Sequence, residues 1–201
     1  MKKNKTALIT GASKRVGKSI AIFLAKKGYN IAIHYNKSEK EAKNLKSQIQ
    51  SFGVQVNCFK LDLQKVDKIS KWFEKINDYF GTINLLINNA STFYYDSLQS
   101  SSIEGFDKHF DVNLKAPFFI SKKFVESLKN KKGDIVNIID QRVLNITPYF
   151  TTYTLSKCGL YSMTKSLALS LAPNIKVNAI APGPTLKSHR QSEKQFKEQT
   201  P

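Results

Sequence analysis

Short apolar segments alternate with longer amphipathic segments along almost the whole chain, and this alternation most limits the possible folds. The short segments are nearly continuous in apolar residues, as strands are when both faces of a parallel sheet are covered. The amphipathic segments repeat their apolar residues with the period of an α-helix. The predicted strands are residues 6–10, 30–34, 54–61, 83–87, 134–139 and 176–181, and the predicted helices are residues 15–27, 38–52, 65–79, 103–129 and 151–172.

This order of segments predicts an α/β fold, a Rossmann-type doubly wound parallel sheet of six strands in the order 3-2-1-4-5-6. The chain of 201 residues is long enough for one such domain, residues 1–201. In this fold a ligand binds at the carboxyl ends of the strands, where the first and fourth strands diverge. Two local details are also expected: a capping box from Ser38 to Glu41 and a bend at Pro117.

The net charge is strongly positive, with 32 Lys and Arg against 15 Asp and Glu and a formal balance of +17. Nucleic-acid binding is therefore one alternative function. We disfavour it because the lysines are scattered and only three basic residues are arginine, the side chain best suited to bidentate phosphate or base contacts. The same positive field would attract an anionic cofactor.

No apolar run is long enough to span a membrane, and the N-terminal residues lack the apolar stretch of a signal peptide. The two cysteines, Cys58 and Cys158, lie far apart in the sequence and have no metal-binding spacing. These features predict a cytoplasmic protein with reduced cysteines, no membrane partner and no metal site.

A glycine-containing turn follows the first predicted strand, reading Thr10-Gly11-Ala-Ser-Lys-Arg15-Val-Gly17. Glycines there let the chain turn tightly, so that backbone N–H groups at a helix N-terminus approach a pyrophosphate. The spacing alone also fits an ordinary strand-to-helix turn. Its place in the first strand–helix–strand unit favours a dinucleotide site.

The end of the second predicted strand lacks the acidic residue that usually holds the ribose 2′-hydroxyl of NAD. A carboxylate there would repel a 2′-phosphate, whereas Lys37, Ser38 and nearby Arg15 can bind one through charge-assisted hydrogen bonds. The sequence therefore predicts NADPH rather than NADH. The alternative is that Lys37 is one more surface lysine. His34 is expected to be a structural residue of this strand, and His109 a surface residue.

Polar residues follow the third and fourth predicted strands as well. Asp62 either accepts a hydrogen bond from the adenine amine or caps the next helix. Asn88-Asn89-Ala90-Ser91 follows the fourth strand at the switch point, where small residues let the backbone pass close to a cofactor.

A tyrosine and a lysine four residues apart, Tyr153 and Lys157, follow the fifth predicted strand and Asp140, which stands at the end of that strand. Residues at this spacing share one face of a helix, so the phenol and the ammonium can point into the same crevice. We expect the ammonium to lower the phenol pKa from its ordinary value of about 10 and to make Tyr153 a general acid.

In combination these motifs resemble the short-chain dehydrogenase/reductases. Thr10/Gly11/Gly17, Asn88/Asn89/Ala90, Tyr153/Lys157 and Pro182/Gly183 occur in the order typical of that family, over essentially the whole chain. The resemblance implies that Tyr153 is the general acid and that Lys157 binds the nicotinamide ribose. It also implies that Asn113 holds a water of the proton relay.

Three departures from the common pattern resemble the pteridine-reductase and dihydromonapterin-reductase branch. Arg15 replaces the middle glycine of the turn, Ser91 replaces a glycine after Asn-Asn-Ala, and Asp140 stands where most members carry a catalytic serine. The resemblance implies that Asp140 joins Tyr153 in protonating a pterin and that Phe93 stacks on it.

The expected function is therefore an NADPH-dependent reductase that transfers hydride to a C=N bond of a dihydropterin. The alternative is a short-chain reductase of another carbonyl or imine, such as a ketone or 3-oxoacyl compound. The candidate catalytic residues are Tyr153, Lys157, Asp140 and Asn113, and the candidate substrate residues are Ser91, Phe93, Asp140 and Tyr153. The residues predicted to hold the cofactor are Gly11, Ser13, Lys14, Arg15, Gly17, Tyr35, Asn36, Lys37, Ser38, Asp62, Leu63, Asn89, Ala90, Ser91, Lys157, Pro182, Gly183 and Thr185.

Members of this family continue beyond the Pro-Gly motif through a substrate loop, further helix and a seventh strand. The resemblance therefore predicts that this chain is truncated by roughly 40–50 residues at its C-terminus. It further predicts a homo-oligomer, a dimer or tetramer, for the full-length form.

Overall fold

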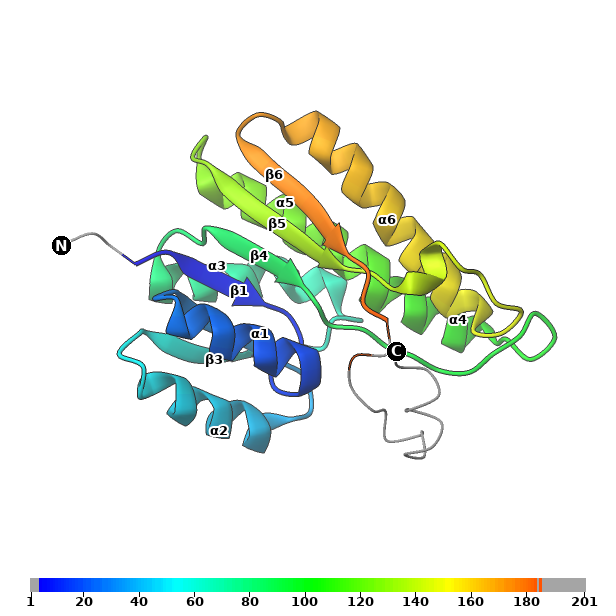
Figure 1. Cartoon of the computed structure of the whole chain (residues 1–201), viewed down its shortest axis with the longest axis horizontal. Helices are drawn as coiled ribbons and strands as arrows, with labels where there is room; N and C mark the ends of the chain where they lie inside the picture. The colour runs from blue at the N-terminus through cyan, green and yellow to red at the C-terminus, as the bar shows by residue number, and fades with distance from the viewer. Residues whose placement is uncertain (1–3, 184, 186–201) are drawn as a thin grey trace.

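The computed structural model describes residues 4–183 and residue 185. It confirms a six-stranded sheet in the order β3-β2-β1-β4-β5-β6, with every neighbouring pair parallel (Figure 1). The strands are β1 (Thr6–Ile9), β2 (Asn30–Tyr35), β3 (Val56–Lys60), β4 (Leu85–Asn88), β5 (Gly133–Ile138) and β6 (Ile175–Ile180). The helices are α1 (Arg15–Lys26), α2 (Glu39–Gln50), η1 (Val66–Lys68), α3 (Ile69–Phe80), α4 (Ile103–Phe110), η2 (Asp111–Lys115), α5 (Ala116–Leu128), η3 (Gln141–Val143) and α6 (Thr151–Leu171).

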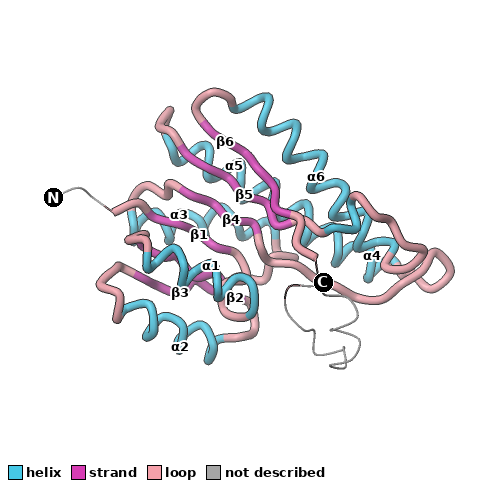
Figure 2. Tube along the Cα trace, in the orientation of Figure 1, coloured by secondary structure: helices cyan, strands magenta, loops and turns pink. Residues whose placement is uncertain are grey.

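Alternate residues of each central strand enter two different cores. Ala7 and Ile9 of β1 pack with residues of α1 and α2, whereas Leu8 between them packs with residues of α3 and α5. Helix α6 packs on the same core as Leu8, over β5 and β6 (Figure 2). The central strands β1 and β2 are thus covered on both faces, which explains why they are buried at every position, whereas β6 exposes Lys176 and Asn178 on the face away from α6.

The long helical segment predicted for residues 103–129 contains a π-helical turn, η2, between α4 and α5. The N–H of Ala116 donates to the carbonyl of Asp111, five residues earlier. Pro117 follows in the first turn of α5 and has no N–H to offer to the carbonyl of Asn113. The expected irregularity therefore occurs as a π turn just before the proline, and it sets the position of Asn113.

The predicted capping box at the start of α2 is wrong. Ser38 makes no capping hydrogen bond through its side chain, although its carbonyl accepts from the N–H of Ala42 at 3.0 Å. The Glu41 carboxylate binds Lys14 Nζ at 2.6 Å instead, so this acid links the start of α2 to the start of α1.

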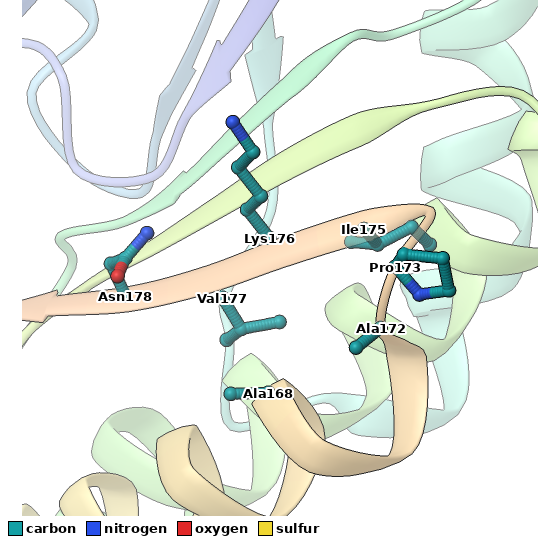
Figure 3. Close-up of a pocket in the computed structure, with 7 residues that line it drawn as sticks. All are labelled: Ala168, Ala172, Pro173, Ile175, Lys176, Val177 and Asn178. Atoms are coloured by element: carbon teal, nitrogen blue, oxygen red, sulfur yellow. The ribbon is translucent and has the colours of Figure 1, made fainter.

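Strands β3 and β6 form the two edges of the described sheet. A pocket of about 280 Å³ lies beside β6 and the end of α6, where Val177 points toward Ala168 and Lys176 points to the opposite face of the sheet (Figure 3). None of the predicted site residues lines this pocket.

Within the described residues, no helix combines the length and the apolar character needed to cross a membrane.

Candidate active site

The turn after β1 approaches the end of β4 so closely that side chains cannot fit between them. Gly11 has φ +63°, and a Cβ there would lie 2.9 Å from the Cα of Ala90. A Cβ on Gly17 would overlap the carbonyl oxygen of Gly11 and lie 2.6 Å from Asn89 Nδ2. Both positions therefore require glycine, and backbone N–H groups at the start of α1 stay accessible to a phosphate.

Asn89 and Thr10 hold this turn against β4. The side-chain amide of Asn89 donates to the carbonyls of Thr10, at 2.8 Å, and Gly11, at 3.2 Å. In return, the Thr10 hydroxyl oxygen accepts from the N–H groups of Asn89 and Ala90 at 2.9 and 3.0 Å. Because these bonds occupy the Asn89 amide, its side chain shapes the cofactor turn.

His34 supports the same turn from β2, a role that the sequence reasoning missed. Its Nδ1 accepts from the N–H of Gly11 at 3.0 Å, so its Nε2 carries the hydrogen and donates to the carbonyl of Leu61 at 3.0 Å. Burial is the main cause that lowers the pKa of His34 from 6.5 to about 4. The imidazole is thus a neutral bridge between the glycine turn and the end of β3.

The residues predicted to select the cofactor lie around the entrance to α1 and α2. Arg15 is the first residue of α1, and its φ of +51° lies in the left-handed region that favours glycine. This agrees with its place at the middle glycine of the turn motif. Lys37 is exposed and Ser38 half-buried in the turn after β2. Lys14 pairs with Glu41, so a phosphate must compete with this carboxylate for the Lys14 ammonium.

Other predicted cofactor residues differ in how their side chains are placed. The Asp62 carboxylate accepts from the N–H of Gln64 at 3.2 Å in the turn before η1. It does not cap that helix, whose N-cap residue is Lys65 and has no side-chain capping bond, so the capping alternative is wrong. Leu63 is only 3% exposed and belongs to the core with the α3 side chains, so its side chain is not part of the cradle. Ser13 and Tyr35 are also buried, whereas Asn36 is half-buried beside Lys37.

The predicted catalytic pair meets Asp140 at the carboxyl end of β5. The Tyr153 hydroxyl donates to Asp140 Oδ2 at 2.7 Å, although 13 residues separate them in the sequence. Lys157 is 2% exposed, and its ammonium donates to the carbonyl of Ile138 at 2.8 Å. The helix α6 thus presents phenol and ammonium on one face, as the spacing predicted, and the segment between β5 and η3 supplies the carboxylate.

The pKa of Tyr153 is raised, which is the opposite of the sequence-based expectation. Burial is the largest cause, followed by the negative charge of Asp140 and the hydrogen bond that the phenol donates to it. Arg142 and the hydroxyl of Ser91 act weakly in the other direction. Burial also lowers the pKa of Lys157 from 10.5 to about 8. Burial therefore decides the direction of both shifts, and Asp140, which contacts the phenol directly, raises the pKa of Tyr153 further.

Asn113 is completely buried, and its side chain joins three segments. Its Oδ1 accepts from the Thr92 N–H at 2.8 Å and the Ser91 hydroxyl at 3.1 Å, and its Nδ2 donates to the Thr92 carbonyl at 3.1 Å. Nδ2 also donates to the hydroxyl of Ser156, three residues after Tyr153, at 3.0 Å. The side chain therefore positions the loop after β4 against α6, and Ser91 takes its place beside Tyr153.

An aromatic group with one arginine covers the same edge of the site. The Phe93 ring stacks on Phe150 with centroids 4.5 Å apart and lies edge-to-face on Tyr153 at 4.7 Å. The Arg142 guanidinium lies 4.8 Å from the Phe150 ring centre, and its Nη1 is 3.7 Å from Asp140 Oδ1. Phe93 thus lies beside Tyr153, but one face of its ring packs on Phe150, and its stacking on a substrate stays a prediction.

The chain after β6 returns to Asp140 and the turn η3. The N–H of Gln141 donates to the carbonyl of Pro182 at 3.4 Å, and a Cβ on Gly183 would lie 3.2 Å from Gln141 Oε1. Thr185 is exposed and donates its N–H to the carbonyl of Gly183 at 2.8 Å. The substrate loop expected after this point lies outside the described residues.

The site fits a nicotinamide dinucleotide phosphate. The close packing around Gly11 and Gly17 keeps the turn before α1 tight, so this turn would receive the pyrophosphate, and basic Arg15 and Lys37 lie at the end where a 2′-phosphate would be held. The buried Lys157 ammonium and the Tyr153 phenol lie on one helix at the other end. The arrangement can hold a dinucleotide and supply a proton beside its nicotinamide.

Comparisons with known proteins agree with this geometry. A family model described as short chain dehydrogenase matches residues 5–198. The chain is 34% identical to the 3-oxoacyl-[acyl-carrier-protein] reductase FabG of Staphylococcus epidermidis, over 90% of this chain and 75% of that protein.

Two solved structures are more similar in sequence. The FolM alternative dihydrofolate reductase 1 of Brucella canis, complexed with NADP, is 40% identical with a TM-score of 0.93, over 98% of this chain and 78% of that chain. The Brucella suis protein of the same name, also in complex with NADP, is 40% identical with a TM-score of 0.94, over 99% and 80%. The chain therefore belongs to the short-chain dehydrogenase family, and it is an oxidoreductase.

Proposed function

We propose that this protein is an NADPH-dependent reductase that transfers hydride to a C=N bond of a dihydropterin, of the dihydromonapterin or dihydrofolate kind. The cofactor is NADP(H), in keeping with the basic residues after β2 and with the NADP complexes of both Brucella relatives. The observation that carries the substrate proposal is the hydrogen bond of 2.7 Å between Tyr153 and Asp140.

A carboxylate paired with the phenol suits an imine of a nitrogen heterocycle. Reduction of C=N requires one hydride for carbon and one proton for nitrogen, and NADPH supplies the hydride when it is bound. The proton leaves from the Tyr153–Asp140 pair, in which the raised pKa of Tyr153 keeps the phenol protonated at neutral pH. Arg142, close to both groups, stabilises the negative charge that remains on the pair.

The relatives support two substrate classes. The FolM likeness, at 40% identity, favours a dihydropterin, whereas the FabG likeness, at 34% identity, favours a 3-oxoacyl thioester. A 3-oxoacyl reductase is therefore the second candidate. Asp140 favours the pterin, because an ionised carboxylate accepts hydrogen bonds from an amino-pyrimidine and does not donate one to a ketone oxygen.

The test measures NADPH oxidation with 7,8-dihydropterins and with acetoacetyl thioester in parallel. We expect turnover of the dihydropterins and little reduction of the thioester. Asp140→Ser should remove most pterin turnover while NADPH binding stays nearly unchanged. Asp134→Asn, an exposed residue at the other end of β5, is the matched control and should behave as wild type. Turnover of the thioester alone would exclude the pterin proposal.

A further inference from the structure

A second polar cluster lies buried behind Tyr153 and has no place in the reaction described above. It consists of Asp96 from the loop after β4, His109 from α4 and Thr152 from α6, which are 7%, 1% and 3% exposed. The prediction that His109 is a surface residue is therefore wrong. None of the three belongs to a sequence motif, because they are separated by 13 and 43 positions along the chain.

The direction of every hydrogen bond in this cluster follows from one backbone donor. The N–H of Tyr94 points at His109 Nε2 at 3.2 Å, so Nε2 accepts and carries no hydrogen. The ring hydrogen is then on Nδ1, which donates to the Thr152 hydroxyl oxygen at 2.6 Å. The Thr152 hydroxyl hydrogen in turn goes to Asp96 Oδ2. The cluster is a chain of donors that runs in one direction and needs a neutral imidazole.

The same carboxylate also holds the start of α6. Asp96 Oδ2 accepts from the N–H of Thr152 at 3.2 Å, and its backbone carbonyl accepts from the N–H of Phe150 at 2.8 Å. Phe150 has φ +60° and ends the loop before the helix. Asp96, which lies 56 positions before Thr152 in the sequence, thus caps the start of α6 at the residue immediately before Tyr153.

The cluster surrounds the ring of Tyr153 from two sides. The His109 ring lies edge-to-face against Tyr153 with centroids 5.9 Å apart, and Phe93, from the loop that Asp96 anchors, lies edge-to-face at 4.7 Å. A shift of this loop or of the first turn of α6 would therefore move the phenol relative to Asp140. Small displacements of this kind can cost a large part of the rate of an enzyme.

We propose that Asp96, Thr152 and His109 are positioning residues for the proton transfer. Their hydrogen-bond chain holds the loop after β4 against the first turn of α6, and so keeps the Tyr153 phenol in position relative to Asp140. None of the three touches the reacting atoms. The proposal rests on Tyr153 as the proton donor and is independent of which substrate is reduced.

The direction of the hydrogen bonds also makes the position of the loop after β4 sensitive to acid. Protonation of His109 places a hydrogen on Nε2, which can then no longer accept from Tyr94. Burial lowers the pKa of His109, Asp96 opposes this shift, and Lys108 adds to it; the rings of Tyr94 and Tyr153 complete its surroundings. Tyr94 should therefore release its hydrogen bond only in acid.

Two substitutions at one position test the positioning role. Thr152→Val keeps the shape but removes the hydroxyl, whereas Thr152→Ser keeps it. The matched control is Thr154→Val, because the Thr154 hydroxyl is buried two residues away on α6 and has no hydrogen-bond partner among the described residues. We expect Thr152→Val to lower kcat/KM by about 10- to 100-fold, with Thr152→Ser within about 3-fold of wild type.

The dissociation constant of NADPH separates positioning from general damage. It should stay within about 2-fold of wild type in all three variants, because the cofactor turn is held by a separate set of bonds around Gly11. The proposal is overturned if Thr152→Val and Thr154→Val behave alike, if serine fails to rescue, or if NADPH binding weakens as much as kcat/KM.

A spectroscopic measurement tests the hydrogen-bond chain without turnover, so it stands even if neither substrate class is reduced. Nitrogen-15 NMR of the histidine rings should show His109 at pH 7 with hydrogen on Nδ1 and His34 with hydrogen on Nε2. The Tyr94 amide should lose protection from exchange on the same acid titration as His109. Hydrogen on Nε2 of His109 at pH 7 would refute the proposed hydrogen-bond chain. So would a rate of Tyr94 amide exchange that does not change as His109 titrates.

Discussion

Acid should weaken this fold through His34, whose imidazole is 2% exposed and bonded at both nitrogens. Burial lowers its pKa from 6.5 to about 4, so between these values the ring is neutral in the folded chain and charged in the unfolded chain. The stability from His34 is therefore complete above pH 6.5 and is lost as the pH falls toward 4. The lost free energy amounts to about 2 kcal/mol at pH 5 and about 3 kcal/mol below pH 4.

Urea unfolding at pH 7 and pH 5, followed by far-UV circular dichroism, measures this loss. The matched variant is His34→Asn, whose side-chain oxygen can still accept from the N–H of Gly11 but which does not titrate. The variant should be less stable than wild type at pH 7, because it loses the bond to Leu61 and the contact with Trp72. The decisive quantity is the change with pH and not the absolute stability.

We expect the free energy of unfolding of wild type to fall by about 2 kcal/mol more than that of His34→Asn between pH 7 and pH 5. All other titrating groups, His109 included, are common to both proteins, so their effects cancel in this difference. Equal losses in the two proteins would show that His34 does not stay neutral in the folded state, and would refute the bridging role.

Four further predictions concern the site. Tyr153→Phe should lower kcat by at least about 100-fold in NADPH oxidation assays, with NADPH affinity within about 2-fold in fluorescence titrations. In wild type, kcat/KM should decline above about pH 8, because the pKa of Lys157 is lowered to about 8 and only the charged ammonium is expected to bind the nicotinamide ribose. A decline that begins only near pH 10 would contradict this. Gly17→Ala should weaken NADPH binding by more than about 10-fold, because its Cβ would lie 2.6 Å from Asn89 Nδ2. Lys37→Ala should weaken NADPH much more than NADH, and equal weakening of both would show that Lys37 does not read the 2′-phosphate.

The helical segment over residues 103–129 shows where local patterns stop being informative. Apolar periodicity located it correctly, and Pro117 marked its irregularity, but the π turn at Asp111–Lys115 was not predicted. A proline only excludes one hydrogen bond, and the path that replaces it depends on what the helix packs against. Here the turn places Asn113 between Thr92 and Ser156.

The catalytic pair shows the same limit for electrostatics. The spacing of Tyr153 and Lys157 was enough to place both on one face of α6. The pKa of the phenol, however, depends on burial and on the distance to Asp140, and neither can be read from the spacing of two residues. The expected direction was therefore wrong even though the residues were right.

The alternation of buried strands and amphipathic helices, the glycine turn after β1 and the residues that meet at the carboxyl ends of the strands could all be predicted from the amino-acid sequence. These are consequences of periodicity and of backbone conformations that few residues can adopt, which are local properties. That His34 supports Gly11, and that Asp96, His109 and Thr152 form one hydrogen-bond chain behind Tyr153, depends on the three-dimensional packing of the chain. Hydrogen bonds between buried groups depend on which distant segments desolvate each other, and no spacing along the chain encodes that.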